Sequence, residues 1–95
     1  MAQPSYSKET NVLRDIAASP NCRFIWTKHA KAAIADDGRV TGDIEYSLTN
    51  GQVVLIEWKK EILWRVDGYD VDGNPITSVI VAYEDEITIK FVTAF

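Results

Sequence analysis

The sequence predicts an α+β domain in which N-terminal helices pack on one antiparallel meander sheet of four to five strands. Apolar residues recur with helical spacing in the first half of the chain, whereas from Gln52 onward they alternate with a period of two. The chain has 95 residues, of which 46% are hydrophobic, which suits one small core. We expect residues 1–22 to form an N-terminal extension with a short amphipathic helix, and residues 23–95 to form the main domain.

Three helices are expected. The first covers residues 7–19, where Val12, Leu13, Ile16 and Ala17 lie at helical spacing and a proline follows directly. A strand over residues 23–26 comes next, and Thr27 is a suitable cap for a second helix whose apolar side is Ala30, Ala33 and Ile34. The run Asp36-Asp37-Gly38 ends that helix. A third helix is expected over residues 43–49, with Asn50-Gly51 as its stop signal.

Four strands are expected after the helices, over residues 53–58, 62–69, 76–83 and 86–95. The first is apolar on both faces, which favours an inner strand. In the second, Ile62, Trp64 and Val66 are expected to face the helices, and Leu63, Arg65, Asp67 and Tyr69 to share the opposite face. Gly68 is the expected position of a bulge.

Charge is unevenly distributed along the chain. The formal net charge is −4, and residues 66–95 carry six acidic side chains and one lysine. Nucleic-acid binding would therefore depend on a local basic patch. No apolar run is long enough to span a membrane, and no signal peptide is recognisable. A single cysteine fits a reducing compartment, so we expect a cytoplasmic protein.

His29, the only histidine, is the first candidate for chemistry because it lies in the first turn of the second expected helix. An imidazole titrates near neutrality and serves as general acid or base, which RNA cleavage through the 2′-hydroxyl requires. The helix N-terminus and Lys28 beside it are suited to binding a phosphate. The alternative is that His29 is a half-buried packing residue, and a lone histidine favours that reading.

Arg65 is the second candidate, because a guanidinium on a rigid strand can stabilise charge that develops on phosphorus. Its alternative is a cross-strand ion pair. Tyr69, four residues further on, could share the same face. The lysines Lys28, Lys31, Lys59 and Lys60 could add phosphate contacts, although solvated surface is the commoner role of such residues.

Other motifs are weaker. Asp70, Asp72 and Asn74 begin like a calcium loop, but the glycine falls at the wrong place and Val81 stands where the final glutamate belongs. No metal site and no cofactor are expected. Cys22 has no activating base and is expected to be inert packing. The three tryptophans, Trp26, Trp58 and Trp64, are expected to anchor the core rather than stack on bases.

Several strings resemble a known family. The segments from Phe24 to Ala30, from Leu48 to Gly51 and from Trp64 to Pro75 are similar to the domain-of-unknown-function family 4258, which is allied to the BrnT and RelE/ParE types of bacterial toxin. The resemblance covers about residues 23 to 94. It implies a strand, two helices and a four-stranded meander of the RelE/BrnT toxin-like kind, in agreement with the periodicity.

The resemblance also implies a function: a small endoribonuclease of a toxin–antitoxin pair that cleaves RNA without metal. His29 matches the threonine-x-histidine-alanine motif of the family, and Arg65 matches a basic strand position. Lys28 and Lys31 would contact phosphate, and Tyr69 would orient the substrate. Family members usually carry an arginine late in the histidine helix, whereas here Arg39 is displaced past Gly38. Arg39 is therefore the substitute expected for phosphate binding.

A different class of function remains open. The acidic last third and the displaced arginine suit a catalytically silent module that binds another protein, such as an inhibitor, an immunity protein or a structural partner. The first helix or a sheet edge would then bind the partner. Convergence of His29 and Arg65 would favour the enzyme, whereas a buried His29 with Arg65 tied to an acid would favour the binding module.

Overall fold

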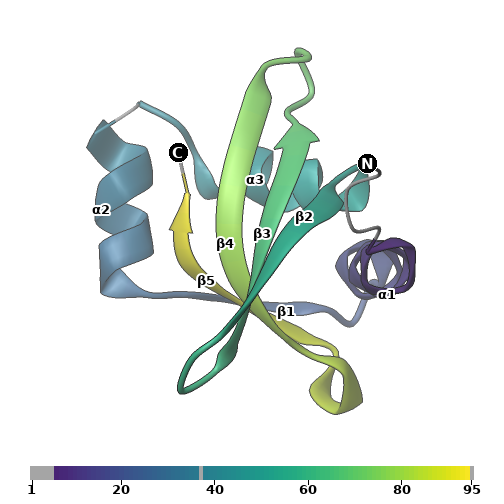
Figure 1. Ribbon diagram of the computed structural model, residues 1–95. Coiled ribbons are helices and arrows are strands. Elements are labelled where there is room, and N and C mark those ends of the chain that lie inside the picture. The colour runs from purple at the N-terminus through teal and green to yellow at the C-terminus, as the bar shows by residue number, and fades with distance from the viewer. Residues whose placement is uncertain (1–5, 37, 95) are drawn as a thin grey trace, which may run out of the picture.

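The structure is a computed structural model that describes residues 6–36 and 38–94, and it has the expected α+β class (Figure 1). Three α-helices precede most of a five-stranded sheet, and one short 3-10 helix, η1, joins the last two strands. Their bounds are α1 Ser7–Ala18, β1 Arg23–Trp26, α2 Lys28–Asp36, α3 Thr41–Thr49, β2 Gln52–Trp58, β3 Ile62–Tyr69, β4 Pro75–Tyr83, η1 Glu84–Glu86 and β5 Thr88–Ala94. No helix in the described part of the chain is long and apolar enough to cross a membrane.

The sheet is mixed, which corrects the expectation of a purely antiparallel meander. The strand order is β1-β5-β4-β3-β2, and β2 to β5 form the expected antiparallel meander. The short β1 lies parallel to β5, with Phe24 opposite Ile89 and Trp26 opposite Phe91. No tight turn constrains this pair, because the helices and the whole meander lie between the two strands in the sequence, so either direction of pairing is open to β1.

The prediction that β2 is an inner strand is wrong, because β2 forms one edge of the sheet. Its apolar run does not mean burial on both faces. Val53 is buried and its N–H donates to the Thr10 hydroxyl oxygen of α1, whereas Val54 and Leu55 are exposed. The β2–β3 pair has a register shift between Val53 and Leu55, and not at Gly68, where a bulge was expected. The periodicity could not show that only one side of this strand is covered.

The core lies between one face of the sheet and the helices. The alternation expected in β3 is confirmed at its centre, where Val66 is buried and both Arg65 and Asp67 are exposed. The hydrophobic core consists of Leu13, Ile16, Ala17, Ala30, Ile34, Ile44, Leu48, Val53, Val66, Ile76, Ile80, Ile89 and Phe91. α1 and α3 pack beside each other over β2 and β3, whereas α2 packs against β5 (Figure 1).

Gly68 has a different role from the expected bulge. The register of β3 with β4 continues through it, with Gly68 opposite Ile76. A Cβ atom at Gly68 would lie 2.2 Å from the carbonyl oxygen of Ser47 in α3. The glycine therefore lets the backbone of α3 approach the sheet closely, a use of glycine that depends on its missing side chain.

Several expected boundaries shift by one or two residues. α3 begins at Thr41 rather than at residue 43, and β5 begins at Thr88 because Glu84–Glu86 forms η1. Ile87, with a φ of 49°, closes that turn in the left-handed region. The end expected for α2 is confirmed at Asp36, and Gly38 follows with a φ of 69°. Asp37 and Phe95 lie outside the described residues.

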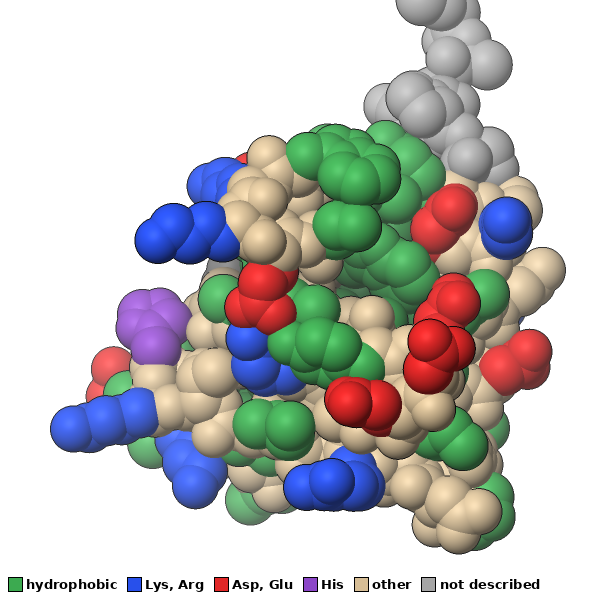
Figure 2. Space-filling view, turned by 90° about the horizontal axis from the view of Figure 1, so that it is seen from below, with side chains coloured by type: hydrophobic (Ala, Val, Ile, Leu, Met, Phe, Trp, Pro, Cys, Tyr) green, Lys and Arg blue, Asp and Glu red, His purple; other side chains and the backbone are tan. Residues whose placement is uncertain are grey.

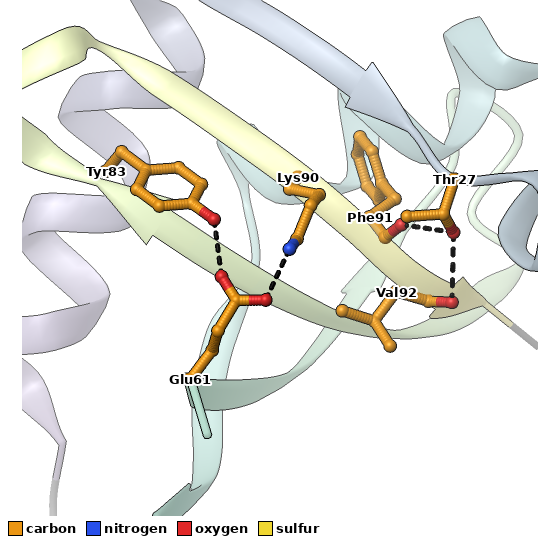
Figure 3. A network of polar contacts seen from close by, with 6 residues as sticks. All are labelled: Thr27, Glu61, Tyr83, Lys90, Phe91 and Val92. Carbon is orange, nitrogen blue, oxygen red and sulfur yellow. Dashed lines mark hydrogen bonds and ion pairs between the residues drawn. The ribbon is translucent and has the colours of Figure 1, made fainter. Parts of the chain in front are cut away.

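The tip of the β2–β3 hairpin, Lys59–Glu61, contacts β4 and β5 through Glu61, which bonds Tyr83 and Lys90 (Figure 3). The β3–β4 ladder ends at the pair of Trp64 and Ile80, so the hairpin separates from β4 beyond that point. Val81 points away from the face that bears Ile80, yet it is only 5% exposed. The hairpin therefore shields part of the second face of the sheet.

Candidate functional site

The start of α2 is fixed by Thr27. Its hydroxyl group donates to the carbonyl oxygen of Phe91 at 2.9 Å, and its oxygen accepts the Ala30 N–H at 3.1 Å (Figure 3). The Thr27 carbonyl accepts the N–H of Lys31 at 3.0 Å. The expected cap is thus confirmed, and it also joins the helix to β5. These hydrogen bonds fix the position of the first turn of α2, and with it the backbone of His29, relative to the sheet.

His29 is exposed at the second position of α2. Ala30 and Ile34 occupy the inward side of this helix, and His29 lies about 100° around the helix axis from Ala30. Within residues 6–36 and 38–94, no hydrogen bond or ion pair involves the His29 side chain. The interpretation of His29 as a half-buried packing residue is therefore wrong, and its imidazole is accessible to a substrate.

Exposed lysines come from two elements on either side of Thr27. Lys28 and Lys31 are exposed on α2, while Lys59 and Lys60 come from the hairpin. These two hairpin lysines line one cavity of about 370 Å³ with Thr27, together with Glu61, Leu63, Lys90 and Val92. Figure 2 shows basic side chains on both sides of the histidine. We call Lys28, His29, Lys31, Lys59 and Lys60 the basic surface.

Arg65 lies apart from the basic surface, on the face of the sheet opposite Val66. Its directly opposite residues are Leu55 in β2 and Val79 in β4, neither of which is an acid. Val79 in turn lies opposite Thr93 of β5. Two strand spacings, about 10 Å, therefore separate the backbone of Arg65 from β5, the strand against which α2 packs.

Tyr69 and Arg39 are both placed next to Pro75, at the other end of the molecule. The Arg39 guanidinium donates to the carbonyl oxygen of Pro75 at 3.4 Å, and Pro75 lies opposite Tyr69 in the sheet. The backbone of Tyr69 is held by Asn50, whose amide accepts its N–H and donates to its carbonyl oxygen, each at 2.9 Å. Tyr69 is 58% exposed and lies about 13 Å along β3 from Arg65.

The structure thus divides the expected site residues into three groups. Lys28, His29 and Lys31 lie at the start of α2, Arg65 lies in the middle of the sheet, and Tyr69 and Arg39 lie at the β3–β4 end. In Figure 1 the start of α2 and the β3–β4 loop lie at opposite ends of the fold. The structure therefore does not show the convergence of His29 and Arg65 that would favour the enzyme.

Beside the basic surface lies a network of polar side chains that the sequence did not lead us to expect. The Glu61 carboxylate accepts hydrogen bonds from the Tyr83 hydroxyl and the Lys90 ammonium group (Figure 3). The contact with Lys90, then that with Tyr83, lowers the pKa of Glu61. The hydrogen bond to Glu61 also raises the pKa values of Tyr83 and Lys90. The only sequence signal was that Lys90 is the single basic residue in an acidic third.

Other candidates have structural roles. Trp26 stacks on Phe91 with ring centroids 4.0 Å apart and donates to Glu45, and Trp64 packs against the core. The expectation that all tryptophans anchor the core is wrong for Trp58, which is 78% exposed. Trp58 stands at the end of an edge strand that extends past the helices, where nothing in the described chain covers it.

The two remaining candidates are explained by local contacts. Asp70 accepts hydrogen bonds from the N–H groups of Asn74 and then Asp72, which lower the pKa of its carboxyl group and shape the β3–β4 turn. Burial, then the charge of Glu45, raises the pKa of the half-buried Cys22 thiol. In the described residues, no three side chains of His, Cys, Asp or Glu come together in a way that could hold a metal ion.

Comparison with protein-family models found no match for this chain, and neither the curated proteins nor the solved structures gave a significant match. Arguments about function therefore depend on the geometry described above and on the resemblance in the short segments of sequence.

Proposed function

We propose that this chain is a small endoribonuclease of the toxin–antitoxin type that cleaves RNA without a metal ion. The observation that supports the proposal is the exposed His29, which stands on a helix start fixed by Thr27 and lies between Lys28 and Lys31 in the sequence of α2. An acidic chain that carries one local basic surface can attract a phosphate to that surface alone. The proposal places the protein in the cytoplasm, where RNA is found.

In the proposed reaction, the RNA 2′-oxygen attacks the adjacent phosphorus and the bond to the 5′-oxygen breaks, which leaves a 2′,3′-cyclic phosphate. His29 transfers a proton at one of these two oxygens, and water exchanges the proton at the other. Lys28 and Lys31 balance the charge on the phosphate. The first turn of α2 also offers N–H groups to an anion, apart from that of Ala30, which Thr27 accepts.

Arg65, Tyr69 and Arg39 have more distant roles in this proposal. Because about 10 Å separates the backbone of Arg65 from β5, Arg65 would contact a neighbouring nucleotide rather than the phosphate beside His29. Tyr69 and Arg39, at the β3–β4 end, would contact the RNA further along. Their removal should therefore weaken RNA binding more than it slows the chemical step.

Protein binding is the second candidate function. It is favoured by exposed apolar side chains at one end of the sheet, above all Trp58 and Ile62, which are opposite each other in β2 and β3. Neighbouring exposed apolar residues of this kind often mark an interaction site. The sequence suggested the first helix or a sheet edge for this role.

A cleavage assay tests the endoribonuclease proposal. Wild type, His29→Ala and the control Lys8→Ala, all purified in parallel, are incubated with end-labelled RNA in EDTA, and products are checked for a 2′,3′-cyclic phosphate. Lys8 is exposed on α1, away from the basic surface. We expect cleavage by wild type and by Lys8→Ala and at least about 100-fold less by His29→Ala. Equal rates for all three proteins would rule out His29 chemistry.

A further inference from the structure

A groove of about 500 Å³ lies where the β2–β3 hairpin separates from β4. Ile62 and Trp64 of β3 form one wall, and Val81, Ala82 and Tyr83 of β4 form the other. Four charged residues complete its lining: Lys60, Glu61, Glu84 and Asp85. The groove shares the hairpin tip with the cavity beside Thr27, but its opposite wall is β4 and η1 rather than β5 and Thr27.

The groove exists because the β3–β4 ladder stops early. β4 continues to pair with β5 as far as Tyr83 opposite Thr88, but its pairing with β3 ends at Ile80. Residues 81–83 of β4 therefore have a ladder partner on one side only, within the described chain. An extended peptide can use such a strand edge for main-chain hydrogen bonds while its side chains enter neighbouring pockets.

The apolar part of the groove continues onto the surface. Ile62 is 42% exposed and lies opposite the exposed Trp58 at the end of the β2–β3 ladder. Trp64 is partly buried against the core and holds the inner wall in place. A rigid aromatic wall next to exposed apolar side chains is typical of a position that receives an apolar anchor residue from a partner.

The rim of the groove is acidic. Glu84, Asp85 and the adjacent Glu86 are all exposed on η1, and no cation in the described part of the chain forms an ion pair with them. Figure 2 shows a group of acidic side chains on the side of the molecule away from the histidine. Three consecutive acids repel one another, and a basic partner would relieve that repulsion.

We propose that this groove binds an extended segment of another protein that carries an apolar anchor residue flanked by Lys or Arg. The acidic rim disfavours RNA, whose phosphates it would repel. It also disfavours a symmetric pair of this chain, because the same acidic patch would then face itself across the interface. The inference deepens the second candidate function, and it holds whether or not His29 cleaves RNA.

The test uses a displayed library of random seven-residue peptides selected on the immobilised full chain. We expect enriched peptides to combine an aromatic or aliphatic residue with adjacent Lys or Arg. Synthetic copies of them should bind Glu84→Lys/Asp85→Lys at least about tenfold more weakly than wild type. Ile62→Asp should cause a similar loss by removing the apolar contact.

The control variant Asp15→Lys/Asp72→Lys makes the same change in net charge at two exposed acids on α1 and on the β3–β4 turn. It should bind the peptides within about twofold of wild type, with the folding of every variant confirmed by circular dichroism. Equal weakening by both double variants, unchanged binding to Ile62→Asp, or no enrichment of basic apolar peptides would overturn the proposal. A dimer that Ile62→Asp dissociates would show that a second copy is the occupant, and would also overturn it.

Discussion

The Thr27 hydroxyl donates a hydrogen bond to the carbonyl oxygen of Phe91 at 2.9 Å, which ties the first turn of α2 to the last strand of the sheet. The same oxygen accepts the Ala30 N–H. One small side chain thus caps the helix and positions His29 relative to β5. The position of the proposed catalytic residue depends on this contact more than on any contact of the histidine itself.

Replacing Thr27 should therefore affect both stability and activity. Thr27→Ala removes a helix cap and should lower the free energy of unfolding by about 1–2 kcal/mol, measured by urea denaturation. Thr27→Ser keeps the hydroxyl and should stay much closer to wild type. RNA cleavage should fall in Thr27→Ala under conditions in which the protein is still folded. If Thr27→Ser lost as much stability as Thr27→Ala, the hydrogen bonds would not explain the effect.

The network of Glu61, Tyr83 and Lys90 predicts a pH dependence of stability. The pKa of Glu61 is lowered in the folded state, so its contribution is present above its unfolded pKa and is lost as the pH falls through the folded value. The pKa values of Lys90 and Tyr83 are raised, so their contribution is lost as the pH rises through their folded values.

Denaturant unfolding of wild type and Glu61→Gln over a range of pH measures this effect. Wild type should be the more stable protein at neutral pH, and the difference should shrink in acid, where Glu61 is protonated in both states. It should also shrink in strong alkali. The side chains of Glu61 and Lys90 are partly exposed, and water screens their attraction, so the expected difference in stability is small. A difference that stayed constant from acid to neutral pH would show that the carboxylate charge is not involved.

Two glycines offer a matched test of the packing between α3 and the sheet. A Cβ atom at Gly68 would meet the Ser47 carbonyl oxygen at 2.2 Å, whereas one at Gly42 in α3 would have open space. Gly68→Ala should lower the free energy of unfolding by about 1–3 kcal/mol. Gly42→Ala should leave it unchanged or raise it by up to about 1 kcal/mol. Equal effects at the two positions would mean that the sheet and α3 leave room for a Cβ atom at Gly68.

Local patterns predicted much of this fold. The helical spacing from Val12 to Ala17 and the alternation around Val66 placed the first helix and β3 correctly, because each pattern reports which side of one element is buried. The pairing of β1 with β5 and the edge position of β2 could not be predicted in this way. Both depend on contacts between segments that are far apart in the sequence.

In the candidate site, too, contacts between near neighbours in the sequence could be predicted and contacts between distant segments could not. Thr27 could be identified as a cap because its partner, Ala30, is three residues away. The contact of Glu61 with Lys90 spans 29 positions, and no local pattern indicates it. The rise of a strand sets the distance between Arg65 and Tyr69, which were expected to share one face, whereas their distance from the start of α2 required the strand order.

Bacterial growth after induced expression tests the central claim most directly. Wild type and His29→Ala are expressed at equal abundance, with the folding of both confirmed, and growth is followed after induction. We predict that wild type arrests growth and that His29→Ala does not, because the exposed imidazole carries the proposed cleavage of RNA. Arrest by both proteins, or by neither, would contradict the account.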